Sequence, residues 1–424
     1  MANKGLNFSF SKTISEEVLN NYLSRAASYN FFGRDEYQVN STVMENGMNA
    51  VFKIGAKYVP RALATWIPRA KEEQCYGELG KWISYAHSID PEIIFEGCIF
   101  EVIFSTANEI SVPEWVFEEF DLQAESRCFD YKKMLFDDER ELSDQGAGSY
   151  IPDITKLETQ MWFYYRARKL IDIGIESFHL GQTSLIGKED TDNDCWADVI
   201  RRIRRYASEH ARRNYVLINS HSDLEFTDPA DGRMLVDFIS SPLRLAVADG
   251  QEDHAASEEN PQKCDIYPNR DYFGKSYEKD GVWYERTDEE IKQLIYNYSP
   301  YQKENGIFGV SPSGWTTKHY PYLVEFDNWG SSKSDHTSAT EAIWGYDEIS
   351  WFANQPDSYR RYFLGYISNK IIGYGENGHV AMPGRRMVYL TALGKELYYD
   401  IAGARFNDTD EIAEIWKSQN TQAN

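Results

Sequence analysis

The 424-residue sequence predicts an α/β fold, a (β/α)8 barrel of the TIM type, and three observations support this prediction. Segments with strand-like and helix-like patterns alternate along most of the chain, which is typical of a parallel sheet. The strand-like segments are almost continuously apolar, as expected for strands that are covered on both faces. There are about seven or eight of them, and no G-x-G-x-x-G motif follows the first, so a closed barrel is favoured over an open dinucleotide-binding sheet.

The first half of the chain supplies the early strands and helices of this barrel. A strand, a helix and a second, longer strand are expected at Ala50–Ala56, Glu72–His87 and Ile93–Phe104. The next helix has signals at both ends: Thr155 and Glu158 fit a capping box, and Gly174 follows the last turn as a stop signal. This helix would connect the second strand to the third.

The second half continues the alternation of strands and helices. Strands are expected at Ile175–Gln182, Tyr215–Asn219, Met234–Ile239 and Tyr322–Asp327, and a further one within Ala342–Trp351. Trp196, Val199 and Ile203 recur at helical spacing and predict a helix with one apolar face between the third and fourth strands. A late helix is expected at Asp357–Ile372.

Two segments do not fit the simple alternation. The stretch 246–320 is long for a loop between a strand and a helix, so it is expected to be an insertion between late strands that packs over one end of the barrel. Ile412, Ile415 and Trp416 indicate an amphipathic terminal helix. The expected domains are therefore a barrel at 1–381, which includes the insertion, and a small C-terminal appendage at 382–424 packed on the barrel.

Composition narrows the class of partner. The formal net charge of −23 argues against nucleic acid and against an anionic membrane as partners. The sequence contains no run of 18 or more apolar residues, so no membrane span is predicted. Aromatic residues reach 15%, which suits a site that stacks flat sugar rings, although most of them are expected in the core. A carbohydrate is therefore the expected substrate.

Cysteine usage and the N-terminus leave the compartment open. The five cysteines are scattered and form no C-x-x-C pair, so neither a disulfide framework nor a zinc site is predicted. The first residues lack the apolar core of a secretory leader, which fits a cytoplasmic protein or a secreted or periplasmic one whose leader was removed. The oligomeric state is not predicted by any feature of the sequence.

The most informative stretch is Tyr322–Trp329, Y-L-V-E-F-D-N-W. It indicates a short apolar strand that carries Glu325 and Asp327 at its far end. Residues two apart on a strand point to the same side, and two neighbouring carboxylates are costly to remove from water. The pair is therefore expected to be functional, although a solvated loop that begins one residue earlier would also explain it.

Other polar residues are expected at the same rim, because the active groups of such barrels lie at the carboxyl ends of the strands. The candidate catalytic carboxylates are Glu325, Glu101, Asp327 and Asp237. The candidate substrate-binding residues are His179, Gln182, Asn219, His221, Trp329, Trp344 and Asp347. Glu96 and Glu101 are five residues apart and cannot both face inward from a regular strand, so Glu101, nearer the catalytic end, is preferred. Each candidate taken alone could also be a paired core residue.

Paired carboxylates in an aromatic-lined cup suit the cleavage of glycosidic bonds, because one acid protonates the leaving oxygen while the other attacks or activates water. Over roughly Ala50–Ile372 the chain resembles the (β/α)8-barrel glycoside hydrolases in architecture and rim carboxylates. Many members carry an Asn-Glu pair that ends the fourth strand and a Glu that ends the seventh. The resemblance implies that Glu325 is the nucleophile. The Asn-Glu pair is absent here, which leaves Glu101, Asp237 or Asp327 as the acid.

Two alternatives stay open at this point. The rim groups could bind sugar hydroxyls in a carbohydrate-binding barrel without catalysis. The chain could also be a metal-dependent hydrolase that uses His179, His221 and Asp237, but the spacing of these residues carries no specificity and no H-x-H motif occurs. No metal and no cofactor are therefore predicted.

Overall fold

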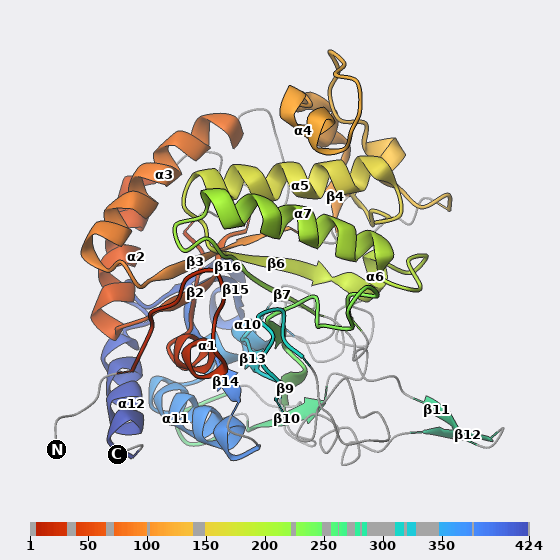
Figure 1. Cartoon of the computed structure of the whole chain (residues 1–424). Coiled ribbons are helices and arrows are strands. Elements are labelled where there is room, and N and C mark those ends of the chain that lie inside the picture. Colours follow the sequence, from red (N-terminus) through yellow and green to blue (C-terminus); the bar gives the residue numbers. More distant parts are fainter. Residues whose placement is uncertain are drawn as a thin grey trace.

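The computed structural model describes residues 6–31, 40–64, 72–99, 102–138, 149–221, 226–247, 256–261, 263–268, 276–279, 282–285, 310–317, 320–327, 347–374 and 377–422. Its centre is a curled sheet of seven parallel strands in the order β14-β13-β8-β7-β6-β3-β2 (Figure 1). These strands are β2 Tyr58–Leu63, β3 Ile94–Cys98, β6 Ser177–Gln182, β7 Leu217–His221, β8 Phe238–Ser240, β13 Tyr322–Val324 and β14 Gly378–Val380. Each strand pairs with its neighbours in chain order, so the predicted α/β class with a parallel sheet is confirmed.

Helices cover the outside of this sheet, and several lie in pairs (Figure 1). The longer ones are α2 Ser41–Ile54, α3 Glu72–Ile89, α5 Leu157–Asp172, α7 Asp194–His210, α11 Asp357–Tyr374 and α12 Thr409–Gln422. The shorter ones are α1 Glu16–Leu23, α4 Glu114–Glu119, α6 Thr183–Ile186 and α10 Glu348–Ala353. None of the helices in the described part of the chain is long and apolar enough to cross a membrane.

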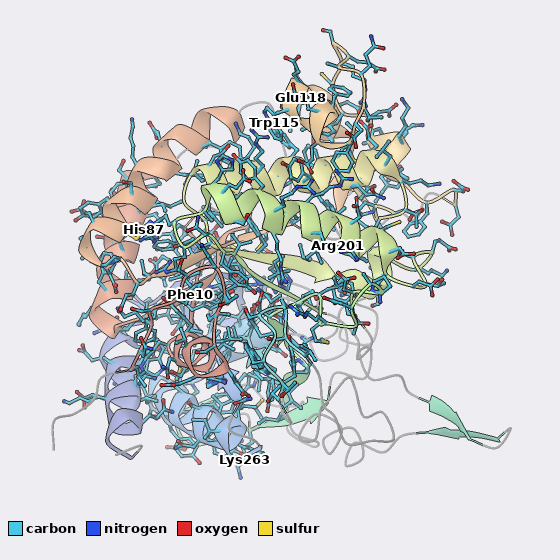
Figure 2. The ribbon with its side chains drawn as sticks, in the orientation of Figure 1. Phe10, His87, Trp115, Glu118, Arg201 and Lys263 are labelled. Carbon is cyan, nitrogen blue, oxygen red and sulfur yellow. The ribbon has the colours of Figure 1, made fainter. Side chains whose placement is uncertain are left out.

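The helices pack on the sheet through apolar and aromatic side chains, and on α7 the charged side chains lie on the opposite side. On α7 the apolar side is buried, whereas Arg201 lies on the outer side, where its Nε donates to Asp228 Oδ2 at 2.8 Å (Figure 2). Trp115 of α4 stacks on Tyr165 of α5 with the ring centroids 5.8 Å apart (Figure 2). The predicted amphipathic helix that begins near Trp196 is thus confirmed.

A short strand near the N-terminus, β1 Ala27–Tyr29, bonds to strands from both ends of the chain. It pairs in parallel with β15 Met382–Leu390, which follows β14 directly, and β15 pairs in turn with β16 Lys395–Asp400. On its other side Ala26 forms a parallel bridge with Tyr58 of β2. The 382–422 region therefore shares its hydrogen bonds with the start of the chain.

The N-terminal segment fills the amino-terminal end of the curled sheet. Its buried side chains include Phe8, Leu19 and Tyr22, and they form one apolar cluster with the first residues of several strands. Those strand residues are Tyr58, Ile94, Leu217, Phe238 and Leu323. Because this end of the strands is packed with apolar groups, polar side chains gather at the carboxyl end.

Several predicted elements are confirmed. They are the helices at Glu72–His87 and Asp357–Ile372, the strands that begin near Ile175, Tyr215 and Tyr322, the terminal amphipathic helix, and the stop signal at Gly174, which adopts a φ of 94°. The predicted strand Met234–Ile239 is reduced to β8. The predicted strand Ile93–Phe104 ends at Cys98, and its last residues form β4 Ile103–Phe104, which pairs with β5 Ser149–Tyr150.

Three predictions about local structure are wrong. Ala50–Ala56 is not a strand, because a capping Asn40 starts α2 and the apolar run is that helix's last turn, with Gly55 at its end. No strand covers the described part of 342–351, where α10 forms instead. The capping box is absent, because Glu158 pairs with Arg127 through its two carboxylate oxygens at 2.6 and 2.9 Å.

The domain division stays a prediction. Within 246–320, the described residues include β10 Cys264–Pro268, which pairs with β9 Leu243–Val247, and the antiparallel pair β11 Ser276–Lys279 and β12 Val282–Glu285.

Replacing Gly384 with alanine is expected to destabilise the β1–β15 pairing. A Cβ at this position would lie 2.8 Å from the backbone oxygen of Ser28, which cannot rotate away. We expect a loss of about 1–3 kcal/mol in the free energy of unfolding, measured by urea denaturation. Gly365→Ala on α11 is the matched control, since nothing lies within 4 Å of its Cβ and the helix should gain stability. Equal stability of the two variants would contradict the close packing at Gly384.

Candidate active site

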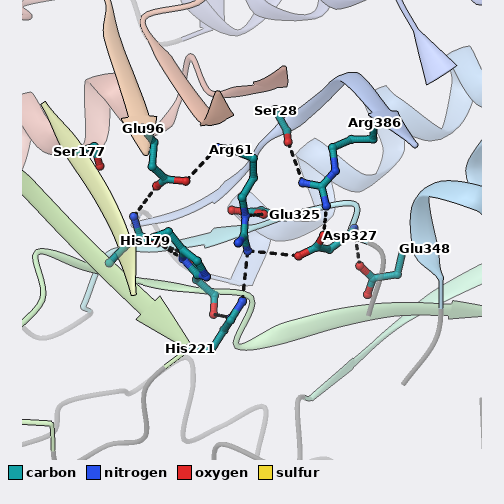
Figure 3. Close-up of polar contacts among 12 residues, drawn as sticks. Ser28, Arg61, Glu96, Ser177, His179, His221, Glu325, Asp327, Glu348 and Arg386 are labelled. Atoms are coloured by element: carbon teal, nitrogen blue, oxygen red, sulfur yellow. Dashed lines mark hydrogen bonds and ion pairs between the residues drawn. The ribbon is translucent and has the colours of Figure 1, made fainter. Parts of the chain in front are cut away.

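Two carboxylates follow β13 and lie buried at the carboxyl end of the sheet. Glu325 is 1% exposed and Asp327 is 8% exposed. Both point toward the guanidinium of Arg61, which comes from β2 (Figure 3). The structure thus brings together two of the predicted catalytic carboxylates, with a cation that the sequence analysis did not identify.

Arg61 binds both carboxylates through its guanidinium. Its Nε donates to Glu325 Oε2 at 2.9 Å, and its Nη2 donates to Asp327 Oδ2 at 3.2 Å. The two donor nitrogens are bonded to the same carbon of the planar guanidinium. This geometry places Glu325 and Asp327 close together in the core.

An irregularity of β2 turns Arg61 toward the site. The residue has a φ of 59°, and the pairing of β2 with β3 shifts register between Val59 and Leu63. Such a register shift re-aims a side chain, and a left-handed residue other than glycine is strained unless its surroundings hold it. Glu96 of β3 supplies this support by accepting the backbone N–H of Arg61 at 2.9 Å.

Asp327 is held by two guanidinium groups and by backbone hydrogen bonds with Glu348. Besides Arg61, Arg386 of β15 donates its Nη2 to Asp327 Oδ1. The backbone of Asp327 exchanges hydrogen bonds with Glu348 of α10: its N–H donates to Oε2 at 3.0 Å, and its carbonyl accepts the N–H of Glu348 at 3.1 Å. Arg244 donates to the other oxygen of Glu348 at 2.6 Å. Each oxygen of Asp327 therefore accepts from a guanidinium, which stabilises the ionised form.

Glu325 differs from Asp327 in having one oxygen without a partner. Its Oε1 accepts no hydrogen bond from the residues that the structure describes. Burial raises the pKa of Glu325 to about 7, Arg61 opposes this, and the nearby charges of Asp327 and Glu96 raise the pKa further. Two neighbouring carboxyl groups with unequal environments are typical of acid–base sites.

A chain of hydrogen bonds continues from Arg61 to the predicted rim residues of β6 and β7. Arg61 Nη2 lies 3.2 Å from His221 Nε2, and since an arginine can only donate, this Nε2 accepts. The hydrogen of His221 is then on Nδ1 and points to the carbonyl of Ser240 at 3.1 Å. His179 Nδ1 lies 2.7 Å from Asn219 Oδ1, and the two imidazole centroids are 4.6 Å apart.

Both imidazoles are neutral in this network. Burial lowers the pKa of His179 and of His221 well below the ordinary range, and Arg61 lowers both further. Asn219 joins this pair to Glu96, since its Nδ2 donates to Glu96 Oε2 at 2.6 Å. Tyr58 also donates to that oxygen. The predicted residues His179, Asn219 and His221 thus belong to the cluster around Arg61.

Buried neutral histidines predict a loss of stability in acid. Burial lowers the pKa of His379 to about 3, so the unfolded chain binds its proton first and the free energy of unfolding falls as the pH drops from 6.5 toward 3. Each such histidine contributes a slope of about 1.4 kcal/mol per pH unit in this window. We expect His379→Gln, outside the carboxylate cluster, to flatten the slope by about that amount in urea denaturation at pH 7, 6 and 5. An unchanged slope would contradict this assignment.

The other predicted residues do not join the cluster or lie outside the described residues. Asp237 accepts from Arg204 of α7 at 3.1 Å and from the N–H of Ile218 at 2.8 Å, apart from Arg61. Asp347 caps α10, with its two oxygens accepting from the N–H and hydroxyl of Ser350. Gln182 ends β6 and pairs in register with His221. Glu101, Trp329 and Trp344 lie outside the described residues.

The residues of the site that the sequence did not mark as site residues include Arg61, Glu96 and Arg386. The sequence favours Glu101 over Glu96, but β3 carries Glu96 into the network. Arg61 sits in an apolar segment, Y-V-P-R-A-L, and a lone buried arginine there is a usable signal because an arginine is rarely buried without partners. Arg386 lies in the region assigned to an appendage and gives no comparable signal.

The structure does not bring His179, His221 and Asp237 together as a set of metal ligands. His179 and His221 are adjacent, but Asp237 bonds to Arg204 instead of facing them. In the part of the chain that the structure describes, no three His, Cys, Asp or Glu side chains are grouped as metal ligands. Around Arg61 the structure instead places two buried carboxylates that accept hydrogen bonds from arginines.

No protein-family model and no curated protein matches the chain. Among solved structures it is similar to an α-amylase from Geobacillus thermoleovorans, with 11% identity and a TM-score of 0.43 over 94% of this chain and 79% of that one. A debranching enzyme from Nostoc punctiforme gives 10% identity and a TM-score of 0.43 over 95% and 80%.

A third solved structure matches a smaller part of the chain. It is a β-L-arabinopyranosidase from Geobacillus stearothermophilus, with 10% identity and a TM-score of 0.30 over 52% of this chain and 54% of that one. The chain spans about half the length of that enzyme. These solved structures are glycoside hydrolases, but at such distance they do not identify the reacting groups of this chain.

Proposed function

We propose that this chain hydrolyses glycosidic bonds of a carbohydrate at the carboxyl end of a (β/α)8 barrel. The seven parallel strands and β1, which bonds to β15 and to β2, would together make the eight strands of the ring. Glu325 and Asp327 would carry the chemistry. The net charge of −23 disfavours a strongly anionic substrate, so a glycan with few charges is the expected class.

The observation that carries this proposal is the difference between the two carboxyl groups. Asp327 has a guanidinium on each oxygen, whereas Glu325 shares one oxygen with Arg61 and leaves the other without a hydrogen bond from any described residue. The pKa of Glu325 is raised to about 7, mainly by burial. One group is thus suited to stay ionised and the other to hold a transferable proton near neutrality.

In the proposed reaction, Oε1 of Glu325 donates its proton to the glycosidic oxygen as the bond from that oxygen to the anomeric carbon breaks. The Asp327 carboxylate attacks the same carbon and forms a glycosyl ester. Glu325, now ionised, takes a proton from a water molecule whose oxygen then displaces Asp327. The carboxylates return to their starting protonation states, and the products are the alcohol of the leaving group and a sugar with a free anomeric hydroxyl group (a hemiacetal).

The shared guanidinium favours a retaining course. A retaining pair is separated by roughly 5 Å and an inverting pair by roughly 6.5–9.5 Å, because the latter must admit a water molecule. Two carboxylates bound to neighbouring nitrogens of one arginine are close, and Asp327 is the more exposed of the two. These observations support Asp327 as the proposed nucleophile, in place of Glu325, which the resemblance implied.

A second candidate function is carbohydrate binding without turnover. It is favoured by one observation, the complete burial of the Glu325 side chain in an ion pair with Arg61, because a buried ion pair is compatible with a purely structural role. Under this candidate, the rim groups would bind sugar hydroxyls and Glu325 would not meet the substrate.

The two candidates are separated by measuring released sugar from a panel of oligosaccharides and glycans. We expect turnover by the unmodified protein and a loss of roughly 10²–10⁴-fold in kcat for Glu325→Gln, which keeps the shape but removes the acid. Asp408→Asn is the matched control, since Asp408 is equally buried and pairs with Arg360 away from the site. Glycan binding by calorimetry without turnover would favour the second candidate and contradict the first.

A further inference from the structure

We infer that Arg386 is a positioning residue for the proposed reaction and that β15, in the C-terminal region, is therefore part of the active site. This inference rests on the proposed function. Arg386 would fix the carboxylate of Asp327 in the orientation needed for attack. Two guanidinium groups would then hold this carboxylate, that of Arg61 from β2 and that of Arg386 from β15.

The geometry of β15 directs Arg386 into the site. Ser28 of β1 pairs with Pro383, but the next residue, Tyr29, pairs with Arg385, so β15 carries one extra residue at Gly384. The backbone oxygen of Ser28 lies where a Cβ on residue 384 would clash, at 2.8 Å. An extra residue on one strand turns the side chains that follow it. Arg386 then faces Asp327, whereas Arg385 bonds to the carbonyl of Asn30 at 2.7 Å.

β2, on the other side of β1, also has an irregular register that turns an arginine inward. On β2 the register shift around Arg61 turns that arginine inward, and on β15 the extra residue at Gly384 turns Arg386 inward. Both guanidinium groups reach Asp327, on different oxygens. Ser28 of β1, between the two strands, accepts from Arg386 Nη1 at 3.3 Å. Arg386 is thus built into the site and is not a surface charge that happens to lie nearby.

Removal of Arg386 would change the behaviour of both carboxyl groups. Asp327 Oδ1 would lose the guanidinium of Arg386, and the orientation of the carboxylate would be less firmly fixed. Among the described residues, the charged and titratable groups around this point include Arg61, Glu325, Asp327, Glu348, His179, His221, Glu96 and Cys98, with Arg244 behind Glu348. Arg386 also lowers the pKa of Glu325, so its loss should raise that pKa.

The test compares Arg386→Met with Arg385→Met, Arg386→Lys and the unmodified protein. Arg385 is the neighbouring residue on the same strand and is similarly buried, but it pairs with Asp400 outside the cluster. For Arg386→Met we expect kcat to fall about 10²-fold with KM nearly unchanged, as when a reacting group is displaced by about 1 Å. The basic limb of the pH profile should move to higher pH. Arg386→Lys should restore part of kcat, and Arg385→Met should match the unmodified protein in both readouts.

The outcomes separate this inference from the proposed function. If the unmodified protein turns glycans over and Arg386→Met behaves like Arg385→Met, with the same kcat and pH limbs, the inference is overturned and the proposed function stands. If the unmodified protein turns no glycan over, the proposed function fails. In that case the inference, which rests on that function, is overturned with it.

Discussion

Replacing Arg61 with methionine is expected to cost about 3–5 kcal/mol in the free energy of unfolding at pH 8, because it leaves two buried carboxylates without their shared cation. Methionine fills a similar volume, so most of the loss would be electrostatic. The measurement is urea denaturation followed by circular dichroism. Activity should fall with stability, since the relative placement of Glu325 and Asp327 depends on this one guanidinium.

The cost of losing Arg61 should depend on pH. The raised pKa of Glu325, about 7, means that this group is mostly protonated at pH 5, where it needs no cation, and mostly ionised at pH 8. We therefore expect a smaller loss at pH 5 than at pH 8. Lys57→Met provides a control, since Lys57 pairs with Asp90 and Glu92 at a partly exposed site and should cost at most about 1 kcal/mol. A cost for Arg61→Met as small as that control would contradict the buried pairing.

Replacing Asp327 with glycine is expected to lower kcat on the order of 10⁴-fold and to make turnover responsive to added azide. The glycine variant removes the proposed nucleophile and leaves space beside the anomeric carbon. A small anion can enter this space and attack, whereas Glu325 still supplies the proton to the leaving oxygen. The product would be a glycosyl azide of inverted configuration, identified by NMR.

Asp327→Asn is the matched comparison for this experiment. It loses the nucleophile but fills the space, so its activity should stay low with or without azide. Both variants also lose an anion between Arg61 and Arg386, so their stabilities are measured first and assays are done where each is folded. Full activity of Asp327→Gly would contradict the assignment of the nucleophile, and a product with inverted configuration from the unmodified protein would contradict the retaining course.

The sequence predicted the parts of the fold that depend on local pattern. The apolar strands that begin near Ile175 and Tyr322, and the one-sided helix after Asp194, were recognisable because burial on a fixed face produces a fixed period. The strand β2 was missed because Pro60 and Arg61 interrupt its apolar run, and the neighbouring helix α2 ends in a run, A-V-F-K-I, that resembles a strand. The local period therefore failed to reveal β2, where a proline and a buried arginine interrupt the apolar pattern.

The candidate site was predictable only in part, for a related reason. Glu325 and Asp327 were identified because two acids two residues apart after an apolar strand are unusual within a single short segment. Their cations come from positions 264 residues before Glu325 and 59 residues after Asp327, and no local pattern marks such partners. Both arginines are turned inward by register shifts, which depend on how strands pair and not on the residues of one strand.

Asp237 illustrates the opposite failure. Flanked by apolar residues, it resembled a rim carboxylate, but its partners are Arg204 on the outer helix and the backbone of Ile218. A buried acid between apolar neighbours is equally expected in an active site and in a structural ion pair. In both cases polar or charged partners offset the free energy that is lost when the carboxylate is removed from water. Only the position of the cation, which the sequence does not give, distinguishes the two.

The most direct measurement is the titration of the Glu325 carboxyl group by carbon NMR, in protein labelled at its glutamate side-chain carboxyls and with the resonance assigned by its absence in Glu325→Gln. We predict a midpoint near pH 7, set mainly by burial and raised further by the neighbouring charge of Asp327. A midpoint at or below the ordinary value for glutamate would mean that Glu325 is a permanently charged partner of Arg61, and would contradict its role as the proton donor.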